Sequence, residues 1–245
     1  MQYGRFAKVY DALMAEVEYD AWAAYIASFL PGGALSIADC ACGTGEITLR
    51  LCRMGHKVTG IDISEEMLRV ASEKARARGL KIPFARQNIA ELSLHRPVDA
   101  VVCACDGVNY LTSLHDARRF FEAAYAQLKE NGLLLFDISS RYKLARVLGN
   151  NMLGYDDESL AYVWKNCYDE KNALIEMEMS FFTKNERGLY ERFCETHVQR
   201  AHTAAELTRL LLGAGFSKVG VYEAFTQNAP RENAERLQFV AAKGA

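Results

Sequence analysis

The residues between Ile37 and Glu46 combine types and a spacing that favour ligand binding by the backbone. A strand-like run ends at Asp39 and passes through the small residues Cys40 to Gly45 before a helical pattern begins. Small side chains let the backbone approach a ligand closely, and the first N–H groups of a helix are unpaired donors at its positive end. The segment therefore predicts a strand–turn–helix binding site.

Two spacings narrow the ligand class. A dinucleotide turn of the form G-x-G-x-x-G that begins at Gly43 requires glycine at position 48, where this chain has Thr48. Asp62 ends a second strand-like run and lies 17 residues after Gly45, near the distance expected for a ribose-binding carboxylate one β–α unit later. The spacing disfavours a nicotinamide dinucleotide and makes Asp62 a candidate ribose partner.

Asp39, Ala41, Gly43 and Gly45 form the pattern acidic-x-small-x-Gly-x-Gly. This pattern resembles motif I of the class I S-adenosylmethionine-dependent methyltransferases, with Ala41 at the place where the family usually has glycine. The segment from Gly60 to Ser64 looks like the family's second motif, whose acidic residue accepts hydrogen bonds from both ribose hydroxyls. The resemblance implies S-adenosylmethionine as cofactor and S-adenosylhomocysteine as product.

The resemblance extends over residues 37–138. Residues 85–89 are similar to the segment that meets adenine after strand three, with Asn88 where the family often has Asp, and residues 98–106 resemble motif IV. The cofactor-binding residues that the resemblance implies are Tyr10, Asp39, Ala41, Cys42, Gly43, Gly45, Asp62, Ile63, Met67, Gln87, Asn88, Ile89 and Cys105.

Two further segments resemble a bacterial small-molecule-type subgroup of this family. Residues 3–11 are similar to a segment that folds over the cofactor, and residues 106–111 look like the Asp-Ser-x-Asn-Tyr-Leu stretch that lines the methyl-transfer face. Methyl transfer needs the nucleophile, carbon and sulfur held in line, and it needs a base only when the nucleophile is protonated. Asp106, Asn109 and Tyr110 are therefore candidate catalytic residues, and none is identified as a base.

Structural roles stay open for several of these residues. Asp62 and Asp106 also suit capping of the backbone that follows them, and Asp39 suits holding the turn by accepting N–H bonds. Cys-Ala-Cys occurs at residues 40–42 and 103–105, at the ends of two strands that a doubly wound sheet places side by side. Cysteine is common in buried strands, and no histidine pair has ligand-like spacing, so we expect no metal site.

The elements around these motifs alternate between strand-like and helical patterns. Strand-like runs occur at residues 35–39, 57–62, 82–87, 98–104 and 133–138, and a helix through Phe120 is expected to close at Asn131 and Gly132. Further strands at 216–223 and 237–242 would complete the sheet. The pattern predicts an α/β fold with a doubly wound, Rossmann-like, seven-stranded and mostly parallel sheet.

An antiparallel β insertion is expected after strand five. Three long strand-like segments over residues 160–200 carry aromatic side chains, and turn-rich tips join them. We therefore expect a core of residues 1–159 and 201–245, with residues 160–200 forming either a lid over the acceptor or an interface.

Composition sets limits on the partners. With 29 basic and 31 acidic residues the formal net charge is −2, which argues against a broad nucleic-acid-binding face. The longest uncharged stretch is interrupted at Pro31, no signal peptide is visible, and seven cysteines in strand-like runs suggest reduced thiols. We expect a cytoplasmic monomer or homodimer with no membrane or nucleic-acid partner.

The leading functional hypothesis is methyl transfer from S-adenosylmethionine to a small-molecule acceptor by in-line displacement. One alternative is a cofactor-binding or regulatory module without turnover, because such chemistry needs no dedicated acid or base. A protein acceptor is another alternative, whereas a nicotinamide-dependent oxidoreductase fails on Thr48.

Overall fold

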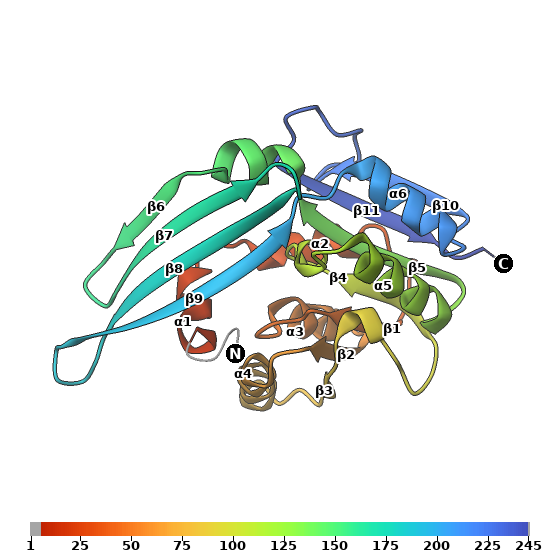
Figure 1. The fold of residues 1–245 in the computed structure, drawn as a ribbon. Coiled ribbons are helices and arrows are strands. Elements are labelled where there is room, and N and C mark those ends of the chain that lie inside the picture. The colour runs from red at the N-terminus through yellow and green to blue at the C-terminus, as the bar shows by residue number, and fades with distance from the viewer. Residues whose placement is uncertain (1–5, 245) are drawn as a thin grey trace.

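The computed structural model describes residues 6–244, which form two sheets of different construction (Figure 1). The larger sheet has the strand order β10-β11-β5-β4-β1-β2-β3, in which β11 runs antiparallel to β5 and β10 and the other neighbours run parallel. This confirms the expected doubly wound, mostly parallel sheet. Its strands are β1 (Ser36–Cys40), β2 (Lys57–Asp62), β3 (Phe84–Arg86), β4 (Val98–Cys103), β5 (Leu128–Ser139), β10 (Lys218–Glu223) and β11 (Arg236–Ala242).

Helices cover both faces of the larger sheet. On one face, Phe120 of α5 and Leu207 of α6 pack against Phe136 and Phe239, whose stacked rings have centroids 4.7 Å apart. On the other face, α2 and α3 pack against β1 and β4. The α-helices are α1 (Ala7–Leu13), α2 (Tyr19–Ala27), α3 (Glu46–Arg53), α4 (Glu65–Ala77), α5 (Leu114–Gln127) and α6 (Ala204–Gly213). Two short 3-10 helices, η1 (Ile89–Glu91) and η2 (Gly107–Tyr110), and a π-helix, η3 (Lys143–Leu148), complete the helical elements of the described residues. No helix in residues 6–244 is long and apolar enough to cross a membrane.

The strand order reverses beside β1, which pairs with β2 on one side and β4 on the other. In a doubly wound sheet, ligands bind outside the carboxyl ends of the strands at such a point. The loops that follow β1, β2 and β4 carry the motif residues, so the fold brings them to one edge.

The second sheet is an antiparallel meander of four strands between β5 and α6. They are β6 (Met152–Asp156), β7 (Leu160–Asp169), β8 (Leu174–Lys184) and β9 (Tyr190–Arg200). The sequence predicted three strands starting at residue 160, and β6 was not among them. Every residue of this edge strand is exposed, so its sequence shows no alternation between apolar and polar positions.

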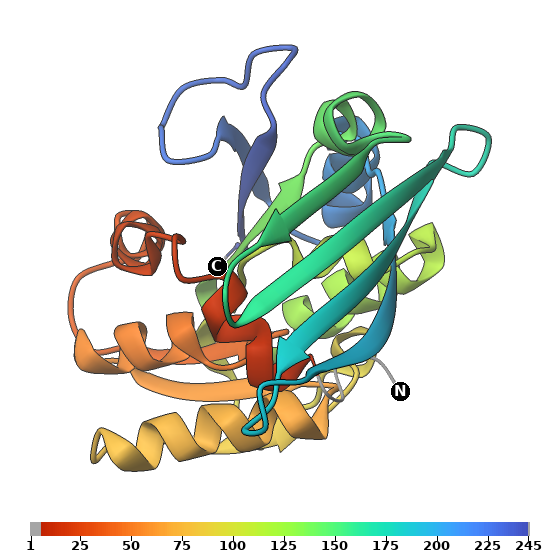
Figure 2. The same cartoon turned by 90° about the vertical axis from the view of Figure 1, so that its left-hand side faces the viewer.

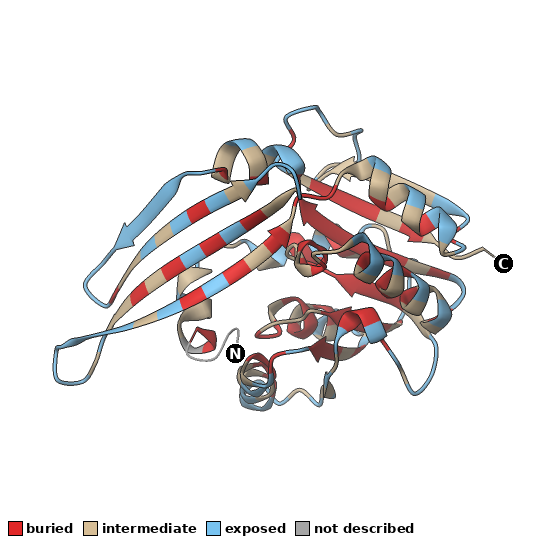
Figure 3. Ribbon diagram, viewed as in Figure 1, coloured by how far each residue is buried: buried red, intermediate tan, exposed pale blue. Residues whose placement is uncertain are grey.

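Burial differs between the sheets (Figure 3). Central strands β1 and β4 are buried almost throughout because helices cover both faces, whereas β8 and β9 alternate between buried and exposed residues. The buried side of the second sheet faces α1, which lies between that sheet and helices α3 and α4 (Figure 2).

The end of α5 differs from expectation. The helix stops at Gln127 and β5 begins at Leu128, where Asn131 and Gly132 were expected to close the helix. Asn131 does adopt a left-handed φ of 60°. It lies in a strand irregularity, however, since the register with β4 shifts between Val98 and Ala100.

Candidate functional site

A cavity of about 900 Å³ lies where the loops after β1, β2 and β4 meet the second sheet. Gly45 and Asn109 do not line it. The other residues singled out in the sequence do: Tyr10, Asp39, Ala41, Cys42, Gly43, Asp62, Ile63, Met67, Gln87, Asn88, Ile89, Cys105, Asp106 and Tyr110. Residues 3–5 of the expected cofactor-covering segment lie outside the described residues.

The turn after β1 depends on left-handed backbone. Ala41, Gly43 and Gly45 have φ values of 53°, 53° and 82°. A Cβ added to Gly43 would meet no atom within 4 Å, so this glycine leaves open space beside the cavity. A Cβ added to Gly45 would lie 3.0 Å from the Cβ of Ala71 in α4, so Gly45 acts through helix packing. The left-handed conformation of Ala41 costs about 1–2 kcal/mol.

Gly107, which sequence analysis did not single out, lets the loops after β1 and β4 touch. A Cβ on this residue would lie 2.7 Å from the Sγ of Cys103 and 2.8 Å from the Cβ of Ala41. Contacts this short require the Cys103 side chain and the turn at Ala41 to shift. Gly107 is therefore required by the close approach of two cavity-lining loops.

Asp62 holds the backbone of two elements at once. Its carboxylate accepts hydrogen bonds from the N–H of Gly43 at 2.9 Å and of Ser64 at 2.8 Å, and Ser64 in turn caps α4. Burial raises its pKa, while these N–H donors oppose the shift. Each carboxylate oxygen has a second acceptor position, so this structural role and ribose binding are compatible.

Asp39 is a second buried carboxylate, with 1% of its surface exposed. Burial raises its pKa to about 7, although the hydroxyl of Thr48 donates a hydrogen bond to it, and the Asp62 charge adds to the rise. The turn thus contains a carboxyl that changes its charge near neutral pH. A cation placed beside it would lower that pKa.

The polar side chains that follow β3 are already bonded to the backbone. Both atoms of the Gln87 amide are used by the backbone of Ser93, at 2.9 and 3.0 Å. Asn88 accepts from the N–H of Ala90 at 3.1 Å and so caps η1. Ile63 is 57% exposed although it is a large apolar residue, which offers a flat apolar contact on this side of the cavity.

A buried charge cluster ties the loop after β4 to distant strands. Cys105 and Asp106 have left-handed φ values of 58° and 54°, and the Asp137 carboxylate accepts both of their N–H groups, at 2.7 and 3.0 Å. Arg236 donates to Asp137 and, at 2.8 Å, to Asp106. Gln199 of β9 also donates to Asp106 at 2.8 Å.

The charges of this cluster stabilise one another. Burial raises the pKa of Asp137, and Arg236 opposes the rise. Burial would lower the pKa of Arg236, but the charges of Asp106 and Asp137 outweigh it and raise that pKa. Asp106 is consequently an ion-pair partner, not an uncommitted base. Asp137 was not among the predicted site residues, although its position near the end of a central strand was a signal, and nothing in the sequence marked Arg236 or Gln199.

Asn109 has a structural place in the described fold. Its amide donates to the carbonyl oxygens of Ser139 and Arg200, at 3.0 and 2.9 Å, and accepts from the N–H of Ser139 at 2.9 Å. These bonds join η2 to both sheets. Because Asn109 is fully buried and off the cavity, the structure does not bring it to a reacting group.

Tyr110, next in sequence, does line the cavity. Its phenol oxygen lies 3.2 Å from Nδ1 of His197 on β9. Burial lowers the pKa of His197 to about 4, so its imidazole is neutral at physiological pH. The pair joins one residue that the sequence indicated to one that it did not.

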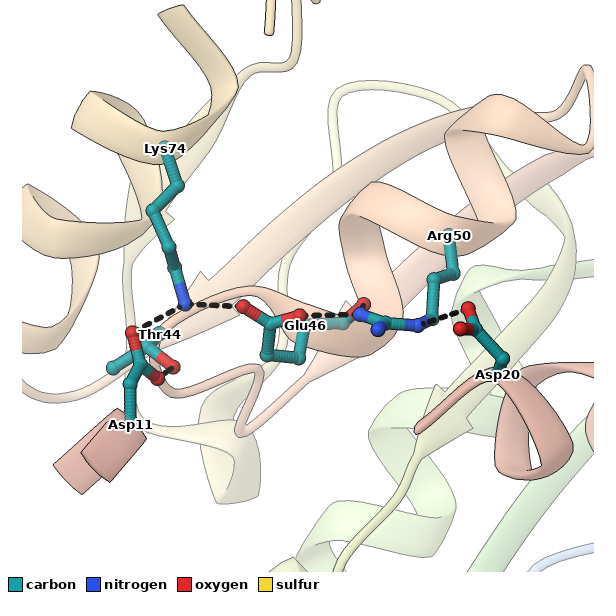
Figure 4. A network of polar contacts seen from close by, with 6 residues as sticks. All are labelled: Asp11, Asp20, Thr44, Glu46, Arg50 and Lys74. Carbon is teal, nitrogen blue, oxygen red and sulfur yellow. Dashed lines mark hydrogen bonds and ion pairs between the residues drawn. The ribbon is translucent and has the colours of Figure 1, made fainter. Parts of the chain in front are cut away.

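The N-terminal helices are attached by a polar network (Figure 4). Lys74 of α4 pairs with Asp11 of α1 at 2.8 Å and with Glu46 of α3 at 2.6 Å. Arg50 pairs with Glu46 and, at 2.6 Å, with Asp20 of α2. Burial opposes ionisation of Glu46, but its bonds to Lys74 and Arg50 outweigh burial and lower its pKa.

Tyr10 enters the cavity from α1. Burial raises its pKa well above 10, and the nearby acidic groups add to the rise. The phenol therefore keeps its proton and can only act as a neutral hydrogen-bonding group.

The repeated Cys-Ala-Cys segments do not assemble a metal site in the described part of the chain, where no three ligand-type side chains converge. Burial raises the pKa of Cys40, Cys42, Cys103 and Cys105, so these thiols keep their protons. Their chemistry is that of small apolar side chains.

Comparisons with known proteins agree with this geometry. Residues 37–132 match the family model described as a methyltransferase domain. A candidate methyltransferase of Geobacillus sp. (strain WCH70) is 40% identical, over 99% of this chain and all of that protein. The crystal structure of an S-adenosylmethionine-dependent methyltransferase from Clostridium acetobutylicum ATCC 824 is 33% identical, with a TM-score of 0.89 over 99% of both chains. An amino pentose methyltransferase from Micromonospora echinaspora, at 19% identity and a TM-score of 0.73 over 96% of both chains, shares the fold.

Proposed function

Since this chain belongs to the class I S-adenosylmethionine-dependent methyltransferases, we propose that it methylates a small molecule bound between the cofactor turn and the second sheet. One observation carries the proposal: a single cavity of about 900 Å³ is lined both by the turn after β1 and by side chains of β7, β8 and β9, half-buried on β7 and mostly buried on β8 and β9. A volume of this order lies near the upper end of the range for small-molecule sites in proteins. The structural relative that acts on an amino pentose supports a small acceptor in this fold.

The turn fits a nucleoside cofactor. Gly43 leaves open space where a Cβ would stand, the backbone around it is held by Asp62, and Ile63 exposes an apolar face. In the proposal, Gly43 and Asp39 lie beside the amino-acid part of the cofactor, Asp62 accepts from the ribose, and Ile63 and Met67 contact the base. The bound cofactor supplies a methyl group already activated by its sulfonium.

The chain's own contribution is positioning. Bringing the acceptor atom into line with the methyl group supplies several kcal/mol by proximity. We propose that the second sheet acts as a lid over the acceptor. Its buried faces line the cavity, and Asn109 and Gln199 tie it to the loop after β4. The exposed strand β6 keeps an interface role open for the outer edge.

A cytoplasmic site of action is part of the proposal. All seven cysteines are free thiols, which fits a reducing compartment.

Calorimetric titration tests the cofactor assignment. S-adenosylmethionine and S-adenosylhomocysteine should bind with one-to-one stoichiometry, and NAD should not bind. Binding of NAD alone would contradict the proposal.

Exchange of β6 residues Met152 and Leu153 for Glu, followed by size-exclusion chromatography, separates the roles of the second sheet. A change in molecular mass would favour an interface, and unchanged mass with unchanged turnover favours the lid.

A further inference from the structure

The acceptor part of the cavity has a wall of large apolar side chains. Tyr162 pairs with Phe181 and Trp164 with Met179 across β7 and β8, so these side chains share one face of the second sheet. Both pairs line the cavity. Aromatic rings and flexible thioethers favour a flat apolar partner.

The charged side chains that line the cavity differ in whether they already have a partner of opposite charge or a hydrogen-bond donor. Four carboxylates line the cavity, and each has described partners. Asp106 binds Arg236 and Gln199, and Glu46 binds Lys74 and Arg50. The remaining two bind Thr48 or the backbone: Asp39 and Asp62. None of these described carboxylates is left as a counter-ion for a cationic amine.

Lys143 has the opposite character. It lines the cavity from η3, and its ammonium forms no ion pair or hydrogen bond with any residue of the described part of the chain. Burial and the nearby Arg236 guanidinium lower its pKa, and the carboxylates of Asp106, Glu235 and Asp137 oppose this shift without cancelling it. An anionic group beside it would relieve this cost, because a half-buried cation is stabilised by an opposite charge.

The Tyr110–His197 pair supplies a path for a proton. A neutral imidazole accepts a hydrogen bond at Nδ1 when its proton is on Nε2, and a phenol oxygen can donate one bond and accept another. Tyr110 therefore suits a hydroxyl that must lose its proton as it gains a methyl group. His197, behind it at 3.2 Å, is a positioning residue that receives the proton.

We propose that the acceptor is a hydroxylated aromatic acid, whose ring lies on the apolar wall, whose acidic group pairs with Lys143, and whose hydroxyl donates to Tyr110. The proposal rests on the methyltransferase function above. In the reaction the hydroxyl oxygen forms a bond to the methyl carbon, and the carbon–sulfur bond breaks with its electron pair staying on sulfur. The hydroxyl proton passes to Tyr110 as the phenol proton passes to His197, and the imidazolium then releases one proton to water.

The imidazole is a weak base, yet it suffices. An oxygen that carries both a methyl group and a proton is strongly acidic, so proton transfer late in the reaction is downhill.

A matched series of acceptors tests the class. The probes are 3,4-dihydroxybenzoate, catechol and 3,4-dihydroxybenzylamine, which share a ring and hydroxyls and differ in charge. With S-adenosylmethionine present, we expect kcat/KM to fall from the acid to the neutral compound to the amine, with at least tenfold between the first and last. Formation of S-adenosylhomocysteine and the mass of the methylated product are the readouts. Preference for the amine, or no methylation of any probe, would overturn the proposal.

Calorimetry with S-adenosylhomocysteine separates this failure from failure of the function. If the cofactor product binds and the probes do not react as expected, only the acceptor class is wrong. If it does not bind, the proposed function fails with it.

Variants test the individual roles. Lys143→Met should raise KM for 3,4-dihydroxybenzoate at least tenfold and leave catechol nearly unchanged, whereas Lys165→Met, at an exposed lysine of β7, should change neither. Tyr110→Phe should lower kcat more than it changes KM. His197→Asn should lower kcat with KM kept, and kcat should then rise with pH as the acceptor loses its proton to solvent. An unchanged ranking in Lys143→Met, or unchanged kcat in both Tyr110→Phe and His197→Asn, would refute the assignment.

Discussion

The two halves of the cavity are built in different ways. The half around β1, β2 and β4 is made of turns in which backbone N–H groups donate to carboxylates. At Gly45 and Gly107 the neighbouring segments approach so closely that an added Cβ would lie 3.0 Å or less from another atom. The half under the second sheet is made of side chains from alternate positions of long antiparallel strands. The first half depends on backbone geometry, and the second depends on side-chain shape and charge.

This difference indicates how each half tolerates change. A turn that positions N–H groups is destabilised when a methyl group is added at a point of close approach or when a carboxylate that accepts those N–H groups is removed. A wall of methionine and aromatic residues accepts exchanges of similar volume. We therefore expect the cofactor half to tolerate few amino-acid substitutions and the acceptor half to tolerate more.

The largest effect should come from Asp39. Its pKa of about 7 in the folded chain, against an ordinary value of 3.8 for an aspartate in water, means that the folded chain holds this proton more tightly. The stability contributed by the protonated form is lost as pH rises from about 4 to 7, by roughly 4 kcal/mol. Asp39→Asn should remove that loss, which urea unfolding between pH 4 and 8 would measure against the wild type.

Asp99 provides a control, because its contribution to stability changes with pH in the opposite direction. Hydrogen bonds from Ser36 and Lys129 lower the pKa of Asp99 to about 2 against the effect of burial, so its contribution is lost as pH falls and Asp99→Asn should cost stability at neutral pH. Parallel pH curves for wild type and Asp39→Asn would show that Asp39 is ionised throughout.

Asp62→Ala should weaken binding of S-adenosylhomocysteine by about 1.5–3 kcal/mol, the range for a lost hydrogen bond to a charged group. Ser64→Ala is the matched control, because it removes the side-chain cap of α4 and leaves the carboxylate in place. Calorimetry should show weakened affinity only for Asp62→Ala. Equal losses in both variants would reduce Asp62 to a capping residue.

Gly107→Ala should cost about 1–3 kcal/mol of unfolding free energy, because its methyl group would press on Cys103 and Ala41. Gly32→Ala, where an added Cβ meets nothing within 4 Å, should stay within about 0.5 kcal/mol of wild type. Thermal unfolding of the two variants checks the difference, and equal melting temperatures would mean that the loops after β1 and β4 are not tightly apposed.

The smallest effect on stability is expected for a substitution in the apolar wall that β7 and β8 form in the acceptor half. Met179→Leu keeps the volume of a buried side chain and should cost less than about 1.5 kcal/mol, with affinity for S-adenosylhomocysteine unchanged. Denaturation and calorimetry measure both quantities. A loss of cofactor affinity here would erase the proposed division between the halves.

Sequence reasoning reached the cofactor half because its signals are local. The glycine turn and Asp62 lie within one β–α unit, so their spacing alone indicates their neighbourhood, and the parallel sheet follows from the alternation of patterns. Ala41 was recognised as a departure from the motif, and its left-handed backbone shows the conformational reason for glycine there.

The acceptor half could not be predicted from the sequence, because its contacts join parts of the chain that are far apart in sequence. His197 meets Tyr110 across 87 residues, and Arg236 meets Asp106 across 130. Which residues of β8 and β9 face inward depends on strand register, which changes face with a one-residue slip. The sequence shows no periodic pattern at the edge strand β6 or at the end of α5. Both boundaries depend on pairing with strands elsewhere in the fold.

Arg236 also affects when the site can form during synthesis. Asp106 and Asp137 leave the ribosome first, and their guanidinium partner follows 99 residues after Asp137. Until then, two carboxylates would have to share a buried position with no cation between them, and β5 lacks the neighbour that completes this side of the sheet. A growing chain can pair β1 to β4 early, but the loop after β4 reaches its final shape only once β11 has been translated and has inserted beside β5.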